Sequence, residues 1–465
     1  MSTHSKPSKN EEEFFARADA ELRKQRRKRA IVEQLVALVP AGSASTRALV
    51  EEHVGREASI VRPSDRLQFT MIADQHDAYR AWKRVTVRIA EREYAMATKP
   101  GTVACGRVDP AAVLLGERLD VANGDVVVQL HCGNGLVGAV AWARGAARVL
   151  LADRNVLSVE AARRTLVENG VGNGEALPGQ GALALPSGTQ ADVVAIRIPP
   201  ERQSLQQLLW DAFHVLRVGG RCYIAGATNE GIRTAERTMD RLFGGGRLLG
   251  QDSGHRVTMA TRRTVEPADR AAIDSPYLDA DAFHEQVATM RGRPFTLCSR
   301  PGVFSWDHLD EATAILAETM LVHPGDSVLD LGCGAGALGT LAGTLSGAPV
   351  TMVDVDVEAV RSATRTAAAA GLSGARILAS DVAGAVLGER FDVVVTNPPF
   401  HVGKMTDLDV PMQFIADAWT VLAPGGRLYL VANRTLPYER VIARWFGNLT
   451  TLHDGRRFKV LSAVR

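Results

Sequence analysis

Residues 327–339 read SVLDLGCGAGALG, and this stretch decides the fold that we predict for the chain. Its apolar residues predict a short buried strand, which ends in glycines that allow a tight turn and a close approach of the backbone to a ligand. Gly334, Gly336 and Gly339 satisfy the pattern G-x-G-x-x-G, and Asp354 lies 20 residues beyond Gly334. This combination is typical of a ligand-binding loop between a strand and a helix of a Rossmann-like α/β sheet.

Strands and helices are expected to alternate on both sides of this loop. Mainly apolar runs at 352–353, 377–378, 393–395 and 428–430 predict further strands, the first of them ending at Asp354, and the stretches between them are long enough for helices. Strands separated in this way indicate a doubly wound, mostly parallel sheet with helices on both faces.

The same series of segments also occurs once earlier in the chain. Gln129 precedes Asp330 by 201 positions, and Asp153 precedes Asp354 by 201. Two further pairs, at 192 and 392 and at 219 and 425, follow in the same order with offsets of 200 and 206. Four ordered matches at a nearly constant offset indicate an internal duplication, and the long period excludes a solenoid.

We therefore predict four regions. They are a basic, mainly helical extension at 1–100, a degenerate first copy at 101–265, a connector at 266–300 and a catalytic second copy at 301–465. The extension has helical spacing of apolar residues over 11–39 and a basic run at 23–29, which is either a solvated face or a contact for RNA phosphates. Basic residues that alternate with Val85, Val87 and Ile89 predict a strand with one charged face, on which Lys99 is also expected.

The glycine loop alone suits either a dinucleotide or S-adenosylmethionine. Asp330 lies at the end of the strand, where its carboxylate would repel the pyrophosphate of a dinucleotide. S-adenosylmethionine carries an ammonium and a sulfonium group and no phosphate, so we predict this cofactor. The loop residues expected to bind it are Asp330, Gly332, Cys333, Gly334 and Gly336.

Acidic residues after the next two strands complete the predicted cofactor site. Asp354 and Val355 follow the second strand, and Asp354 is expected to accept hydrogen bonds from the ribose hydroxyls. Ser380 and Asp381 follow the third strand and are expected to meet the adenine amine.

The stretch TNPPF at 396–400 predicts the catalytic residues. The prolines must end the preceding strand, so the residues lie at the carboxyl edge of the sheet. An exocyclic amine on a base is a weak nucleophile, and two acceptors can turn its lone pair toward a methyl group. The Asn397 side chain and the Pro398 carbonyl are suited to this, Pro399 stiffens the loop, and Phe400 can stack on the base. Reaching a base edge in this way requires a single-stranded or flipped-out nucleotide.

The first copy is altered at the corresponding positions. Gln129 replaces Asp330, His131 replaces Gly332, and the segment RIPP at 197–200 replaces the Asn-Pro-Pro turn. An arginine cannot accept a hydrogen bond from an amine. We predict that the first copy has no catalytic activity and no cofactor, and that it supports folding or binds RNA.

These motifs resemble those of the bacterial ribosomal RNA guanine-N2 methyltransferases, which pair a degenerate methyltransferase domain with an active one. The likeness covers residues 101–465 and is dense from 295 onward; it is carried by PGVFS at 301–305, Leu309-Asp310, the loop 330–336, NPPFHVG at 397–403, VANR at 431–434, LPY at 436–438 and RFKV at 457–460. It favours the small-subunit enzyme over its large-subunit relative. The resemblance implies that Phe304 and Ser305 lie near the cofactor or the target base, where they are candidates for substrate binding. His401, beside the Asn-Pro-Pro turn, is either a solvated loop histidine or a further contact to the substrate. Trp306 and His308 depart from the family pattern.

The predicted function is methyl transfer to the N2 amine of a guanine in ribosomal RNA, with ribosomal RNA or the small subunit as partner. Alternatives are methylation of adenine N6 or of a protein glutamine amide, a non-catalytic RNA-binding or assembly factor, and a nicotinamide oxidoreductase. Five scattered cysteines without a C-x-x-C pair argue against a metal site, and no apolar run is long enough for a membrane span. We expect a soluble, cytoplasmic monomer.

Overall fold

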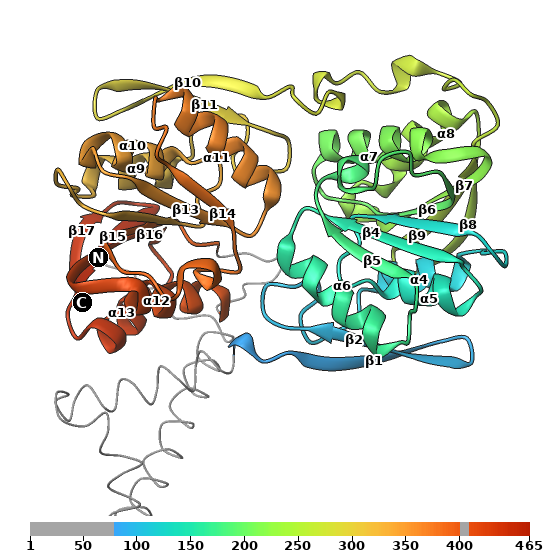
Figure 1. Cartoon of the computed structure of the whole chain (residues 1–465), viewed down its shortest axis with the longest axis horizontal. Coiled ribbons are helices and arrows are strands. Elements are labelled where there is room, and N and C mark those ends of the chain that lie inside the picture. Colours follow the sequence, from blue (N-terminus) through green and yellow to red (C-terminus); the bar gives the residue numbers. More distant parts are fainter. Residues whose placement is uncertain (1–78, 400–408) are drawn as a thin grey trace, which may run out of the picture. The chain divides into compact units, whose positions relative to one another are not determined.

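The computed structural model describes residues 79–399 and 409–465 (Figure 1). The predicted helix at 11–39 and the basic run at 23–29 lie outside the described residues. The same is true of Phe400 and His401.

The first copy of the repeat is a seven-stranded sheet with the order β5-β4-β3-β6-β7-β9-β8. Its elements are α4 (Pro110–Arg118), β3 (Val126–Leu130), α5 (Leu136–Ala143), β4 (Arg148–Asp153), α6 (Val156–Glu168), β5 (Gly174–Pro178), β6 (Ala191–Arg197), α7 (Arg202–Val215), β7 (Leu216–Ala227), α8 (Ile232–Phe243), β8 (Gly246–Asp252) and β9 (His255–Thr261). The strands from β5 to β7 are parallel, and β9 is antiparallel to both of its neighbours.

The second copy has the same topology, with the order β14-β13-β12-β15-β16-β18-β17. Its elements are α9 (Glu311–Thr319), β12 (Val328–Leu331), α10 (Ala337–Ser346), β13 (Val350–Asp354), α11 (Val357–Ala369), β14 (Arg376–Ala379), β15 (Phe391–Thr396), α12 (Asp409–Val421), β16 (Leu422–Asn433), α13 (Tyr438–Phe446), β17 (Thr450–Asp454) and β18 (Phe458–Val464). The predicted duplication of a doubly wound α/β domain is confirmed.

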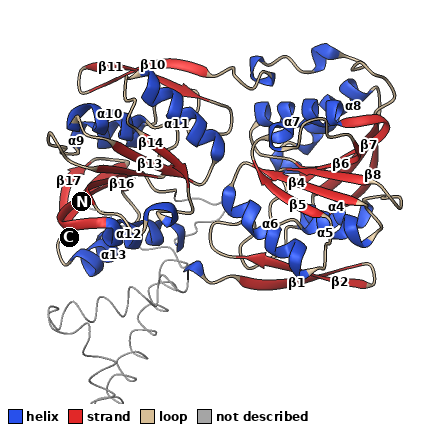
Figure 2. Cartoon of the chain, in the orientation of Figure 1, coloured by secondary structure: helices blue, strands red, loops and turns tan. Residues whose placement is uncertain are grey.

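The central strands of the second copy are buried on both faces because helices cover both (Figure 2). Val394 packs with Ile415 and Val421 on the face covered by α12. Val393 and Val395 point the other way, into the cluster that includes residues of α9 and α10. A strand buried on both sides is expected to be a continuous apolar run, which the sequence shows at 393–395.

A β-hairpin precedes each copy. In the first, β1 (Lys83–Ile89) pairs with β2 (Arg92–Thr98), and in the second, β10 (His284–Met290) pairs with β11 (Arg293–Ser299), 201 positions later. The backbone N–H of Ala97 donates to the Thr165 hydroxyl at 3.1 Å, and that of Cys298 donates to the Thr366 hydroxyl at 2.9 Å. Each hairpin therefore attaches to its own copy by an equivalent hydrogen bond.

The hairpins refine two expectations from the sequence. The strand predicted around Val85 and Val87 is confirmed, with Arg84 and Arg88 on its exposed face, so the described part of the extension is not mainly helical. Lys99, which we expected on the same charged face, is buried instead. The predicted connector at 266–300 contains the second hairpin, so that the chain between β9 and β10 runs only from 262 to 283.

The two copies contact each other through the same loop of each. Asn155 and Asp356 occupy equivalent positions after β4 and β13 and form an isolated β-bridge. The Val156 N–H donates to the Val355 carbonyl, and the Val357 N–H donates to the Arg154 carbonyl, both at 2.9 Å. In a two-fold symmetric interface, equivalent residues of the two halves contact one another. Here an interface of this kind lies within one chain.

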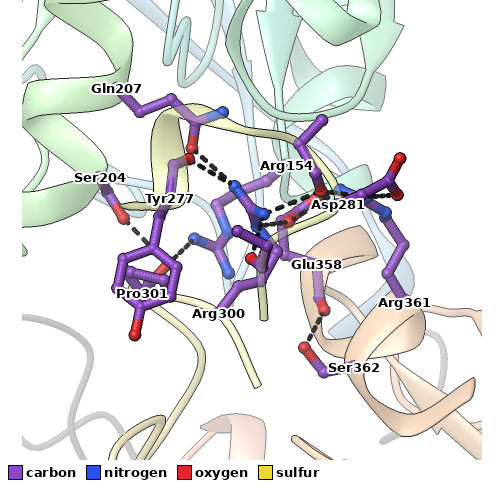
Figure 3. A network of polar contacts seen from close by, with 12 residues as sticks. Arg154, Ser204, Gln207, Tyr277, Asp281, Arg300, Pro301, Glu358, Arg361 and Ser362 are labelled. Atoms are coloured by element: carbon purple, nitrogen blue, oxygen red, sulfur yellow. Dashed lines mark hydrogen bonds and ion pairs between the residues drawn. The ribbon is translucent and has the colours of Figure 1, made fainter. Parts of the chain in front are cut away.

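Two arginines hold this interface together (Figure 3). Arg154 makes two hydrogen bonds to the Asp356 carboxylate, at 2.8 and 2.6 Å, and a third to the Pro301 carbonyl. Arg300 is 1% exposed and lies 2.9 Å from Glu358, which is 2% exposed. Its other guanidinium nitrogens donate to the Gln207 side chain in the first copy and to carbonyls of the connector. Such complete satisfaction is what a buried charge requires.

Replacing Arg300 by Met should destabilise the protein by about 3 kcal/mol, because Glu358 would lose a buried partner. Arg361, at 2.9 Å from Glu358, should limit the loss. Arg84→Met is the matched control, because the pair of Arg84 with Glu168 is largely exposed and should contribute less than about 1 kcal/mol. Urea unfolding followed by circular dichroism measures both, and equal losses in the two variants would contradict the prediction.

Candidate active site

A cavity of about 770 Å³ opens at the carboxyl edge of the second sheet. Most of the residues predicted for the site lie in its wall. These are Phe304, Ser305, Gly332, Cys333, Gly334, Asp354, Val355, Ser380, Asp381, Asn397, Pro398 and Pro399. Segments that are more than 90 residues apart in the sequence therefore meet at one place.

Asp330 and Gly336, which were also predicted to bind the cofactor, do not line this cavity. The Asp330 carboxylate is buried and accepts a hydrogen bond from the Gly339 N–H at 2.7 Å, and burial raises its pKa to about 7. Its other oxygen has no hydrogen-bond partner among the described residues. Gly336 has a φ of 82°, and a Cβ there would lie 2.9 Å from the Cβ of Ala363. Both residues therefore support the glycine loop from the side that faces away from the cavity.

Asp354 connects the glycine loop to the next loop of the sheet. Its two oxygens accept hydrogen bonds from the N–H groups of Gly334 and Asp356, at 2.8 and 3.0 Å. Burial, together with the charge of Asp356, raises the pKa of Asp354 to about 6. No atom of the described residues lies within 4 Å of the position that a Cβ would occupy on Gly334. The backbone of Gly334 is thus open to a ligand.

The orientation of the Asn397 amide is fixed by two residues at the start of α9. Its Nδ2 donates to Asp310 Oδ2 at 3.1 Å and to Thr313 Oγ1 at 3.0 Å. Asp310 also caps α9 by accepting from the Thr313 N–H. Because a carboxylate only accepts, the nitrogen of the amide must face Asp310 and the oxygen must face away from it. Within residues 79–399 and 409–465, Asn397 Oδ1 accepts no hydrogen bond.

Sequence reasoning did not assign these positioning roles to Asp310 and Thr313. Asp310 was noted only as part of the family resemblance. The repeat offers a signal that could have found it, since Asp109 stands 201 positions earlier and also caps a helix, α4, by accepting from the Ala111 N–H.

Ser380 and Asp381 both lie in the wall, but their side chains have different partners. The Ser380 hydroxyl donates to the Val382 carbonyl at 2.7 Å and accepts from the Ala385 N–H, so it stabilises its own loop. The Asp381 carboxylate accepts from the Tyr79 hydroxyl at 2.9 Å and from the Lys99 ammonium at 2.5 Å. Tyr79 precedes the first hairpin and Lys99 directly follows it, and sequence reasoning assigned neither of them to the site.

The rim of the cavity carries aromatic and polar side chains. Phe304 is 61% exposed, and the neighbouring Ser305 has a φ of 47°. Trp306 packs edge-on against Tyr277 and His284, with ring centroids 5.5 Å apart in both cases. The exposed Phe304 ring in the cavity wall offers a surface on which a base can stack.

The first copy keeps the framework of this site and changes its chemistry. Asp153 accepts from the N–H groups of Gly133 and Asn155, as Asp354 does in the second copy. Arg197, however, forms an ion pair with Asp109 at 2.9 Å and another with Glu230. A cation therefore stands where the second copy holds an amide. The ring of His131 contacts the Arg197 carbonyl at 2.7 Å.

The helices within residues 79–399 and 409–465 are all too short or too polar to span a membrane. No group of three or more His, Cys, Asp and Glu side chains in this part of the chain is placed to hold a metal ion.

Comparisons with known proteins agree with this architecture. The family described as methyltransferase small domain matches the chain twice, at residues 93–259 and 294–462. Among solved structures, a 16S rRNA N2-methyltransferase of T. thermophilus, in complex with S-adenosylmethionine and guanosine, is 29% identical with a TM-score of 0.69. The match covers 84% of this chain and 99% of that one.

Curated relatives point the same way. The ribosomal RNA small subunit methyltransferase C of Hahella chejuensis is 36% identical over 290 residues, which are 61% of this chain and 80% of that protein. The protein of the same name from Erwinia tasmaniensis is 34% identical over 276 residues, covering 59% and 76%. The chain therefore belongs to the ribosomal RNA small subunit methyltransferase C family and contains two copies of the methyltransferase small domain.

Proposed function

We propose that this chain transfers a methyl group from S-adenosylmethionine to the N2 amine of a guanine in small-subunit ribosomal RNA, and that the second copy does so alone. The observation that carries the proposal is the Asn397 amide, whose nitrogen is held by Asp310 and Thr313 so that its oxygen is available to an amine. The guanosine bound to the T. thermophilus relative supports a guanine as the target.

The cavity wall fits the proposed cofactor. It includes the carboxylates of Asp310, Asp354, Asp356 and Asp381 and, among the described residues, no lysine or arginine. This lining disfavours the pyrophosphate of a dinucleotide and favours a ligand with positive groups. In the proposal, Gly332, Cys333 and Gly334 hold the cofactor through the backbone, Asp354 accepts from the ribose, and Asp381 accepts from the adenine amine. The cofactor supplies an electrophilic methyl group on a sulfonium.

The residues of the Asn-Pro-Pro turn position the target amine. Asn397 Oδ1 and the Pro398 carbonyl accept its two hydrogens, which turns the lone pair of the nitrogen toward the cavity. Pro399 restricts the turn, and the β15 strand that ends at Thr396 is fixed because the Thr396 hydroxyl donates to the Leu331 carbonyl at 2.7 Å. Most of the acceleration then comes from orientation, because the amine can lose its proton after the transfer. Phe304, Ser305, Phe400 and His401 are proposed to contact the RNA.

The target is tested by mass mapping of 16S ribosomal RNA from cells with and without the gene, followed by methylation of naked RNA and of small subunits by the purified protein. We expect one guanine to lose a 14-Da modification in the deletion strain and to regain it in vitro. Methyl transfer to adenine N6 or to a protein glutamine, or no change in the RNA, would overturn the proposed substrate.

Asn397→Ala should lower kcat by about 100-fold or more, because a preorganised hydrogen-bonding group is lost from the transition state. Its affinity for S-adenosylhomocysteine should stay unchanged in calorimetry. Asp310→Ala should lower kcat less, because the amide remains but is free to rotate. Asp109→Ala, at the equivalent position of the first copy, serves as the control and should keep full activity. Near-normal turnover of the Asn397 variant would contradict the assigned role.

The affinity for S-adenosylhomocysteine should rise several-fold between pH 5 and pH 7.5. The pKa of Asp354 is about 6 in the free protein, and ribose hydroxyls bind the ionised carboxylate better, so binding is weakened as pH falls through that value. Asp354→Asn should bind more weakly at pH 7.5 and should lose this pH dependence. Calorimetry at several pH values measures both, and an equally steep profile in the variant would assign the effect to another group.

A further inference from the structure

We infer that the cofactor site of the second copy is completed from outside that copy, and that Lys99 and Tyr79 are positioning residues that hold Asp381 for recognition of adenine. The inference rests on the proposed function, because it concerns the carboxylate proposed to accept from the adenine amine.

The contacts at Asp381 fix each of its oxygens separately. Lys99 Nζ lies 2.5 Å from Oδ2, and the Tyr79 hydroxyl lies 2.9 Å from Oδ1. Asp381 is partly exposed and lines the cavity. Since each carboxylate oxygen can accept a second hydrogen bond, the two donors set the plane of the carboxylate and leave acceptor capacity for a ligand.

The surroundings of Lys99 hold its ammonium in the ion pair with Asp381. Its side chain is 3% exposed, and its ammonium lies 4.2 Å from the centroid of the Tyr79 ring. Burial lowers the pKa of Lys99, whereas the charge of Asp381 opposes that shift. A buried ion pair adds little net stability compared with apolar packing. An ammonium buried at the edge of a ligand cavity is therefore better explained by what it orients than by stability.

The same chain segment also fixes the loop on the far side of Asp381. Arg80 makes two hydrogen bonds to the buried Asp417 carboxylate, at 3.2 and 3.1 Å, and Asp417 in turn accepts from the Ala383 N–H at 3.0 Å. Between these anchors, Val382 has a φ of 51°, which is unfavourable for a β-branched residue. A strained residue persists only where its neighbours hold it, and here they hold the loop beside the cavity.

Within the described residues, the ion pair of Lys99 with Asp381 has no counterpart at the equivalent positions of the repeat. The repeat places Arg300 at the position of Lys99 and Gln180 at the position of Asp381, both 201 residues away. Arg300 pairs with Glu358 of its own copy and donates to connector carbonyls and to the Gln207 side chain of the first copy; within the described residues, Gln180 is not among its partners. Gln180 carries no charge that would need a cation. A device that only stabilised the contact between copies would have no reason to be confined to the copy that carries Asn397.

The inference is tested by calorimetry of the full chain with S-adenosylhomocysteine and with S-inosylhomocysteine, in which a carbonyl replaces the adenine amine. The unsubstituted protein should prefer the adenine compound. Lys99→Met should weaken binding of that compound by about tenfold, the worth of one charged hydrogen bond, and should reduce the preference toward one. Lys99→Arg should restore part of the preference, and Tyr79→Phe should lower it by a smaller factor.

Lys83→Met is the matched control, because Lys83 is exposed at the start of the same hairpin, and it should leave both affinities unchanged. If Lys99→Met fails to fold, Tyr79→Phe serves as the test of the inference, because it removes only one hydroxyl group. An unchanged preference in the folded variants would overturn the inference and leave the proposed function intact. Absence of S-adenosylhomocysteine binding by the unsubstituted protein would overturn both.

Discussion

The hydrogen bond from the Asn397 amide to the Asp310 carboxylate is the constraint around which the second copy is organised. It joins the end of a central parallel strand to the first turn of α9, so it requires both the sheet and the preceding helix to be in place. Because the carboxylate also caps the helix, its position is fixed by backbone geometry. The position of the Asn397 amide oxygen is fixed as well, whereas a residue on an unsupported loop would not be held in place in this way.

The two copies show how one framework can carry different chemistry. The acid after the second strand holds the glycine loop in both copies, and an aspartate caps the helix before the first strand in both. The residue at the strand end differs, with the Asn397 amide in one copy and Arg197 in the other, and Gln129 and His131 replace Asp330 and Gly332. Replacing the neutral amide by a cation removes a hydrogen-bond acceptor from the site, and the cation pairs with Asp109 instead. The fold is retained.

The sequence predicted the fold because the fold depends on local patterns. The glycine loop, the apolar strand at 393–395 and the offset of 201 residues were sufficient for two doubly wound domains. The wall of the cavity was predicted where residues follow strand ends, since parallel strands bring those ends together. The residues that were missed act through tertiary contacts. Tyr79 and Asp381 are 302 residues apart, and Lys99, in an alternating basic segment, has the pattern of a surface residue. Asp330 was predicted to bind the cofactor, whereas its short side chain turns inward to the helix.

The loop contact between Asn155 and Asp356 has a consequence for how the pocket responds to concentration. An equivalent interface between separate molecules would dissociate on dilution, and a pocket lined from both sides would be lost with it. Here a covalent tether keeps the halves at a high effective concentration, so their association is intramolecular. The composition of the pocket is then independent of how many molecules a cell contains.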